Sequence, residues 1–276
     1  EAVRILREEY RFVGYIHLKV IPGCSEFLIQ KAVLLADRIS SNVELPSAKS
    51  LKLLAPQKAS QNLLLPFRLA SELRETLPST KRATALSMST QMIVGASDES
   101  DLEILKSANY LYRTPNLKRV YYSAFIPTKN DATLPTALPQ KAPPLLREHR
   151  LYQADWLMRV YNFRLDEIAD ENHKMLDEKF DPKISWALRN IELFPVEINK
   201  VEYDMLIRVP GIGITGAKKI IRARKYRALG FEELKALNIS LKKAANFILA
   251  KGRYYHGGSV DSENIKKRLI LSQRVA

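Results

Sequence analysis

A short segment around residue 210 combines a proline, glycines and lysines in a pattern suited to binding an anion. It reads Pro210-Gly211-Ile212-Gly213, and glycines let a backbone turn tightly and approach a partner closely. A helix predicted to begin directly after this turn starts with free N–H groups and the positive end of its dipole, which together favour an anion. Lys218 and Lys219 lie one turn inside that end, within reach of flanking phosphates. The pattern therefore indicates contact with a polyanion.

Two predicted helices must hold this turn in place. Apolar Met205 and Leu206 indicate a short helix before it, and Ala217 and Ile220 indicate the buried face of the helix after it. An ordinary helical hairpin with a glycine turn is the alternative. The proline, the small residue at the helix crossing and the basic second helix together favour contact with nucleic acid.

The segment resembles a helix-hairpin-helix motif, whose hairpin binds a DNA phosphate without reading bases. The resemblance implies that the DNA contacts come from the turn and from the first two turns of the second helix. These residues are Pro210, Gly211, Ile212, Gly213, Thr215, Gly216, Lys218, Lys219 and Arg222.

The charge of the chain is concentrated around this segment. The 276 residues carry a formal net charge of +14, and net charge by itself permits only non-specific binding to a polyanion. Residues 201–276 hold 16 Lys and Arg against 6 Asp and Glu, so +10 of the +14 lies there. A merely solubilising excess of charge does not predict this concentration. The expected partner is DNA, with RNA as the alternative.

Cysteine content and hydropathy limit the cellular compartments in which the protein is expected. Cys24 is the one cysteine, which excludes an internal disulfide or a multi-cysteine metal site in this sequence and favours a reducing environment. No stretch reaches the ~18 apolar residues of a membrane span, and no signal peptide opens the chain. We expect a cytoplasmic protein with no membrane contact. Because the sequence starts at Glu1 without a methionine, and in a helical pattern, we also expect a longer parent protein.

The first ~125 residues alternate β-branched runs with amphipathic helices. The expected fold class is α/β followed by all-α. Strands are predicted at residues 14–21, 38–45, 90–96 and 119–125, and helices at 25–36, 62–74 and 99–112, with a short helix from Ser47. Strands separated by helices imply right-handed βαβ crossovers and a parallel sheet. Four such units make half a barrel or a small open sheet over residues 1–126.

The rest of the chain divides by composition. Residues 127–144 hold five of the 14 prolines and form a linker or loop. A helical connecting region follows at 145–200, then the helix-hairpin-helix domain at 201–251. Within that domain, predicted helices at 231–238 and 241–250 resemble a second, degenerate hairpin. The basic tail at 252–276 is expected to order only on DNA or to stay loose.

Polar residues follow the predicted strands at the edge where parallel sheets bind ligands. Asn42 and Glu44 are two apart, so they share one face of a strand, and an amide and a carboxylate suit ribose hydroxyls. Gln91 and the turn Val94-Gly95-Ala96 belong to the next strand, where a small residue admits a flat adenine ring. The alternative is that Asn42 and Glu44 cap the next helix.

Residues 41–46 and 90–96, followed by Glu99, resemble the fourth and fifth strand motifs of radical S-adenosylmethionine (SAM) enzymes. In that superfamily the first motif contacts the ribose of SAM and the second lies against its adenine. The resemblance therefore implies a SAM site formed by Asn42, Glu44, Gln91, Val94, Gly95 and Ala96. Together with residues 50–56, 121–127, 143–152 and the hairpin, these runs resemble a bacterial radical SAM family assigned to DNA modification or repair, over most of residues 1–250.

The sequence departs from this family in one respect. A radical SAM enzyme holds a [4Fe–4S] cluster on three cysteines spaced Cys-x3-Cys-x2-Cys, and Cys24 alone cannot supply them. We expect the cluster motif upstream in the parent protein, so that this chain binds no cluster and binds SAM only weakly, if at all. No catalytic residue and no metal ligand is predicted here.

Two functions remain open at this point. In the first, the parent protein cleaves SAM reductively and acts on nucleic acid held by this chain. In the second, the chain is a non-catalytic DNA-binding adaptor on a degenerate barrel, and it recruits a DNA-repair protein partner.

Overall fold

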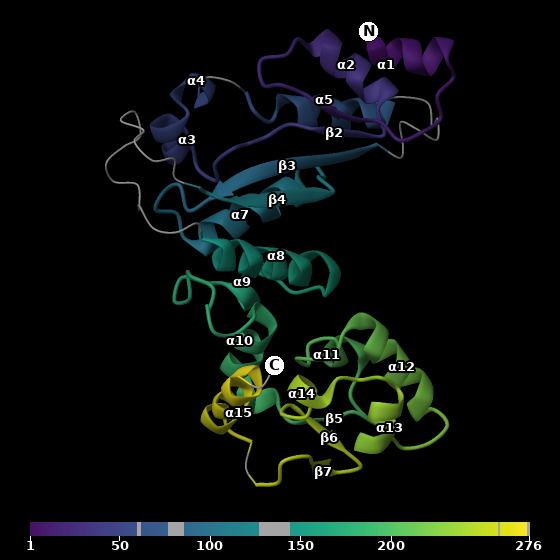
Figure 1. Cartoon of the computed structure of the whole chain (residues 1–276), viewed down its shortest axis with the longest axis vertical. Coiled ribbons are helices and arrows are strands. Elements are labelled where there is room, and N and C mark those ends of the chain that lie inside the picture. The colour runs from purple at the N-terminus through teal and green to yellow at the C-terminus, as the bar shows by residue number, and fades with distance from the viewer. Residues whose placement is uncertain (60–61, 77–85, 127–143, 259, 275–276) are drawn as a thin grey trace. The chain divides into compact units, whose positions relative to one another are not determined.

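The computed structural model describes residues 1–59, 62–76, 86–126, 144–258 and 260–274 (Figure 1). The chain forms two compact units. The first is Glu1–Asp155 with Ala169–Leu176, and the second is Trp156–Ile168 with Asp177–Ala276. The boundary falls inside helix α8 (Leu145–Val160). Residues 127–143 of the predicted linker lie outside the described residues.

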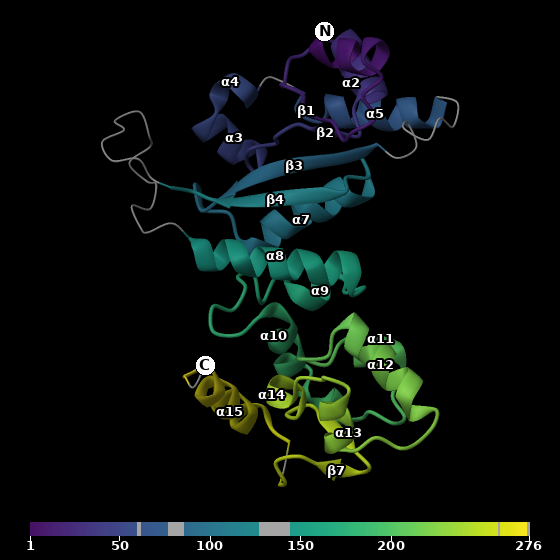
Figure 2. The same ribbon diagram turned by 45° about the vertical axis from the view of Figure 1, so that its right-hand side comes forward.

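The first unit is a four-stranded parallel sheet with its helices, as predicted. The strands lie in the order β1-β2-β3-β4, and all three pairings are parallel (Figure 2). Its elements, in chain order, are α1 (Ala2–Arg4), η1 (Ile5–Glu9), β1 (His17–Lys19), α2 (Glu26–Leu35), β2 (Arg38–Ser40), α3 (Ala48–Leu54), α4 (Pro56–Ala59), α5 (Leu65–Thr76), β3 (Ser87–Val94), α7 (Asp101–Arg113), β4 (Arg119–Ala124) and α8.

Two of these strands are shorter than predicted. β1 begins at His17 rather than at residue 14, because the Ile16 N–H donates to the Asp37 carboxylate (2.7 Å) instead of to a strand neighbour. β2 ends at Ser40 rather than at residue 45. The apolar and β-branched pattern marked the strands but not their ends, since tertiary hydrogen bonds decide where a ladder stops.

Side chains close the free edge of β4. The N–H groups of Val120, Tyr122 and Ala124 donate to the Tyr112 hydroxyl (3.0 Å), the Tyr152 hydroxyl (3.0 Å) and the Glu148 carboxylate (2.6 Å), respectively. Unpaired strand N–H groups invite further pairing, so these acceptors from α7 and α8 end the sheet at this side.

The second unit is mostly helical and also contains a small sheet, so the expectation of an all-α region is wrong. β5 pairs parallel with β6, and β6 pairs antiparallel with β7. Its elements are α9 (Leu165–Ile168), α10 (Pro182–Arg189), η2 (Ile191–Leu193), β5 (Val196–Glu197), α11 (Tyr203–Leu206), α12 (Ile214–Arg224), α13 (Phe231–Ala236), α14 (Leu241–Ala244), β6 (Ile248–Ala250), β7 (Arg253–Tyr254) and α15 (Ser262–Arg274).

The predicted helix at 241–250 is corrected in the same way. It is helical only as α14, and Ile248–Ala250 is strand β6. Ile248 and Ala250 are buried while Leu249 is less so. A short apolar run fits a helix or a strand equally well, and pairing with β5 decides between them.

Aromatic rings form the core of the second unit. The Phe163 ring meets the Trp186 ring edge-on at 5.3 Å, and Phe194 links Trp186 to Phe247. The Arg208 guanidinium lies 4.3 Å from the centre of the Phe163 ring. These contacts give the hairpin region a rigid base.

The predicted loose tail is folded over most of its length. α15 runs from Ser262 to Arg274 and buries Ile265 and Leu269. The Arg268 guanidinium donates to the Asn246 side chain (3.0 Å) and to the Tyr254 hydroxyl (3.0 Å). The apolar face of this helix explains why the tail packs without a ligand.

None of the helices in the described part of the chain has the length and apolar character needed to cross a membrane.

Candidate nucleic-acid interface

Helices α11 and α12 are joined by a tight turn, as the sequence predicts. Gly211 has φ +86°, a conformation that side chains other than glycine rarely adopt. A Cβ built there would lie 2.8 Å from the Ala244 backbone nitrogen, so the turn also packs closely on α14. Pro210 and Ile212 are buried on either side of Gly211. The turn is therefore fixed by conformation and by packing.

Gly213 plays a different role from the one predicted. Its backbone is extended (φ −91°, ψ 174°), so the turn itself does not require glycine at this position. A Cβ at Gly213 would lie 3.3 Å from the Tyr161 hydroxyl oxygen. The reason for a small residue here is the approach of Tyr161 rather than backbone strain.

The carbonyl side of the turn is held by a lysine from α10. Lys183 Nζ donates to the Ile212 carbonyl oxygen (2.6 Å) and lies 4.7 Å from the centre of the Tyr161 ring. Burial lowers the pKa of Lys183 to about 7, with Lys243 adding to the shift and Asp181 opposing it. Because Lys183 engages the turn carbonyl, the turn's orientation is set by a contact from outside the hairpin.

The start of α12 presents backbone donors. The first N–H of the helix with an acceptor is that of Ala217, which donates to the Gly213 carbonyl (2.8 Å). Among the described residues, no backbone carbonyl accepts from the N–H groups of Ile214, Thr215 or Gly216. The start of a helix with free N–H groups favours an anion.

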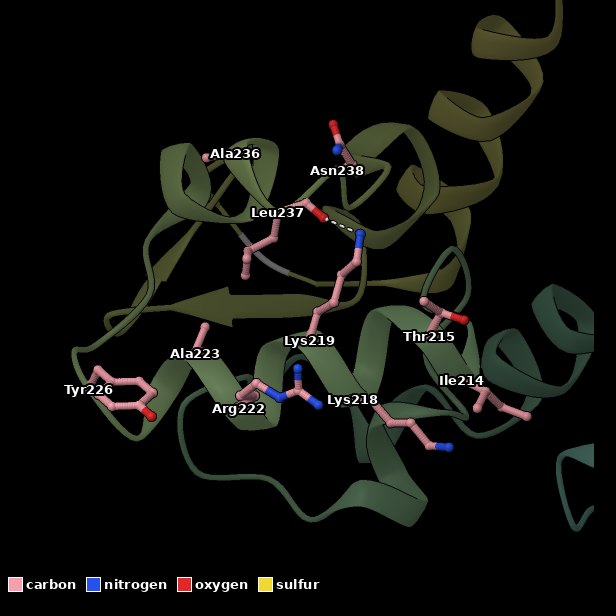
Figure 3. A pocket seen from close by; sticks show the side chains of 10 residues that line it. All are labelled: Ile214, Thr215, Lys218, Lys219, Arg222, Ala223, Tyr226, Ala236, Leu237 and Asn238. Atoms are coloured by element: carbon pink, nitrogen blue, oxygen red, sulfur yellow. Dashed lines mark hydrogen bonds between the residues drawn. The ribbon is translucent and has the colours of Figure 1, made fainter.

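The basic side chains of α12 differ in what they bind. Lys219 Nζ donates to the Leu237 carbonyl (3.1 Å), and Arg224 donates to the carbonyls of Ile198 and Val201. Both residues therefore stabilise the fold. Figure 3 shows Lys218 and Arg222 on the same helix.

Lys218 and Arg222 are exposed. No hydrogen bond or ion pair joins either side chain to another residue in the described ranges. These two cations are therefore available to a ligand, close to the free N–H groups at the start of α12.

The residues expected at the strand ends occupy less regular backbone. Asn42 and Glu44 do not project from one strand, because β2 ends at Ser40 and Glu44 has φ +64°. Glu44 forms an isolated bridge with Met92. Its N–H donates to the Gln91 carbonyl (3.2 Å), so Glu44 and Gln91 are neighbours. Asn42 lies in the irregular segment between the end of β2 and Glu44.

The Glu44 carboxylate already has a partner. Lys58 Nζ donates to it at 2.6 Å, and both side chains are partly buried. A ribose hydroxyl at this carboxylate would therefore join or replace the Lys58 ammonium.

Gln91 and Val94 lie in β3, whereas Gly95 and Ala96 follow its end. Val94 and Ala96 are buried, whereas Gln91 and Gly95 are partly exposed. Gly95 has φ +82°, and a Cβ there would lie 2.7 Å from Pro144 Cγ. The structure thus brings the Gln91 and Glu44 backbones together, while Val94 and Ala96 are buried.

Two residues near the turn and α12, Lys183 and Tyr226, were not predicted from the sequence. Lys183 is far from the hairpin in sequence, and no local pattern marks it. Tyr226 lies four residues after Arg222, so helical spacing could have found it. In the described part of the chain, no three His, Cys, Asp or Glu side chains gather as a metal site requires.

Comparisons of the chain with protein-family models, with curated proteins and with solved structures found no significant match.

Proposed function

We propose that this protein binds DNA through the phosphate backbone, using the turn at Pro210–Gly213 and helix α12. One observation carries the proposal: exposed Lys218 and Arg222 have no partner among the described residues and follow a helix start with free N–H groups. Cations and backbone donors together bind phosphate without reading sequence. The concentration of +10 in residues 201–276 agrees with this partner.

Substitution of Gly213 tests the proposal. Gly213→Asp places a carboxylate at the start of α12, where repulsion of a phosphate costs about 1–4 kcal/mol, so affinity falls about fivefold or more. Gly213→Ala is the matched control, because it adds the same Cβ, 3.3 Å from Tyr161, without the charge. It is expected to retain most of the affinity.

The measurement is fluorescence anisotropy with labelled DNA and RNA at several salt concentrations. Affinity that falls steeply as salt rises supports phosphate contacts. Equal affinities for the Asp and Ala variants, or binding insensitive to salt, would overturn the proposal.

We propose second that the sheet of the first unit is of the radical SAM type and takes part in DNA modification or repair. The adjacency of Glu44 and Gln91 at the carboxyl side of the sheet favours a nucleoside site. The [4Fe–4S] cluster does not fit this chain, since Cys24 is its one cysteine and the cluster takes three thiolates. No reaction step through the cluster is therefore assigned to these residues.

Calorimetric titration of SAM onto the protein tests the second proposal. Binding that Glu44→Ala weakens supports the nucleoside site. DNA binding without SAM binding would instead support the alternative, a DNA-binding adaptor that recruits a repair partner.

A further inference from the structure

A groove of about 670 Å³ runs between α12 and α13 (Figure 3). Ala223 and Leu237 contribute apolar lining, while Lys218 and Arg222 line it from α12. Lys219 reaches from α12 to the Leu237 carbonyl at the end of α13. The groove therefore combines apolar surface with two cations that have no protein partner in the described ranges.

Tyr226 also lines the groove, just beyond the end of α12. Its side chain is 86 % exposed. The Tyr226 N–H donates to the Ala223 carbonyl (3.1 Å), but its phenol ring and hydroxyl form no hydrogen bond or ring contact with any described residue. Tyr255, by contrast, meets the Phe231 ring at 4.9 Å. The fold thus leaves the Tyr226 ring open to solvent beside the two free cations.

Lys218 and Arg222 are four residues apart on α12, so they share one face with a rise of about 6 Å between them. Tyr226 follows at the same sequence spacing, just past the end of the helix. Figure 3 shows the three side chains in this order. A ligand that lies along these side chains meets two cations and then a flat ring.

We propose that this groove binds an unpaired nucleotide, whose base stacks on Tyr226 while the flanking phosphates contact Arg222 and Lys218. The inference rests on the proposed phosphate binding by the hairpin and deepens it. A base inside a duplex has both faces covered by its neighbours, so only a base in a single strand, a bulge or a flipped position offers a face to Tyr226. The preferred substrate is nucleic acid with an unpaired base.

The test compares three ligands of the same sequence: a single strand, a perfect duplex, and a duplex with one bulged 2-aminopurine. In anisotropy titrations, Tyr226→Ala weakens binding to the single strand and the bulged duplex by about 5- to 150-fold, the range expected for one stacked base. Affinity for the perfect duplex changes less than about twofold, because its bases are covered. Tyr226→Phe keeps the ring and the wild-type preference.

Two further readouts separate stacking from other effects. The 2-aminopurine fluorescence is quenched when wild type or Tyr226→Phe binds, and it is not quenched by Tyr226→Ala. Tyr110→Ala removes an exposed tyrosine from α7 in the first unit and serves as the matched control. It leaves all three affinities unchanged.

The outcomes distinguish base stacking on Tyr226 from the proposed phosphate binding on which it rests. If Tyr226→Ala lowers no affinity, or lowers all three equally, base stacking is wrong while phosphate binding stands. If wild type binds none of the ligands, or if Gly213→Asp and Gly213→Ala bind them all alike, the phosphate proposal fails as well.

Discussion

At the carboxyl side of the sheet the charged side chains bind one another, whereas along α12 two cations face solvent alone. Glu44 accepts from Lys58 at 2.6 Å, and Asp101 accepts from Arg147 Nε at 2.6 Å. Lys218 and Arg222 have no such partner among the described residues.

The difference separates two uses of charge. A buried carboxylate with a cation and a backbone donor stabilises the fold, and removing one partner leaves the other uncompensated. An exposed cation without a partner contributes little to stability. Its removal therefore affects an external ligand more than the fold.

The largest expected effect on the free energy of unfolding comes from the buried Asp101–Arg147 ion pair. Asp101 is 1 % exposed, and its carboxylate also accepts from the Leu176 N–H at 2.8 Å. Asp101→Ala is expected to lower the free energy of unfolding by about 3 kcal/mol, because Arg147 and the Leu176 N–H lose their acceptor. Urea denaturation measures this loss.

The matched control for Asp101→Ala is Glu171→Ala, which breaks the exposed ion pairs of Glu171 with Lys106 and Lys174 in the same unit. Its cost is expected to be much smaller, because exposed ion pairs contribute little to stability. Both variants should retain the DNA affinity of wild type. A similar loss of stability in the two variants would contradict the distinction between buried and exposed pairs.

Lys183 gives an intermediate effect that depends on pH. Its folded pKa of about 7 lies below the ordinary lysine value of 10.5, so the unfolded chain holds the proton more tightly between these values. Stability from this group therefore rises as pH increases from 7 to about 10, with a slope below about 1.4 kcal/mol per pH unit. It is lost as pH falls from about 10 to 7, and it changes little below 7, because the folded and unfolded chains then both hold the proton.

Urea unfolding of wild type and Lys183→Met over this pH range checks the assignment. The stability of wild type relative to the variant should increase with pH, because methionine does not titrate. A difference that stays constant from pH 6 to pH 10 would show that Lys183 is not shifted by burial.

The smallest expected effect on stability comes from the two cations of α12 that have no partner among the described residues. Lys218→Gln and Arg222→Gln should change the free energy of unfolding by less than about 0.5 kcal/mol, because neither side chain has a partner. Each should lower DNA affinity a few-fold and reduce the slope of log affinity against log salt by about 1, as one phosphate contact is lost.

Lys106→Gln makes the same change of charge on α7 and is the control for these variants. It should leave the salt slope unaltered. If it weakened DNA binding as much as Lys218→Gln, net charge rather than position would account for binding.

Local patterns in the sequence predicted several elements correctly. Alternation of β-branched runs with amphipathic helices indicated the parallel sheet, and the Pro210–Gly213 turn indicated two flanking helices. The start of α10 is likewise a local feature, since the Asp181 carboxylate, directly before Pro182, accepts from the Ile184 N–H (2.9 Å). These features depend on neighbours within a few residues, so sequence alone reports them.

Other features depend on residues far apart in the chain. Residues 248–250 form a strand because Val196 and Glu197 lie beside them. The bend at Glu44 depends on its bridge to Met92. No local pattern encodes such pairings, so the sequence pattern predicts a β2 that is too long and a helix where β6 lies.

The sequence by itself therefore determined the alternation of strands and helices in the first unit, the glycine turn and the concentration of positive charge in residues 201–276. Tertiary structure alone decided which charges are available. Lys219 binds the Leu237 carbonyl, while Lys218 beside it has no partner in the described chain. The two lysines are identical in type and adjacent in sequence, and only the position of α13 distinguishes them. Availability to a ligand is a property of packing, because a hydrogen bond needs a partner in space.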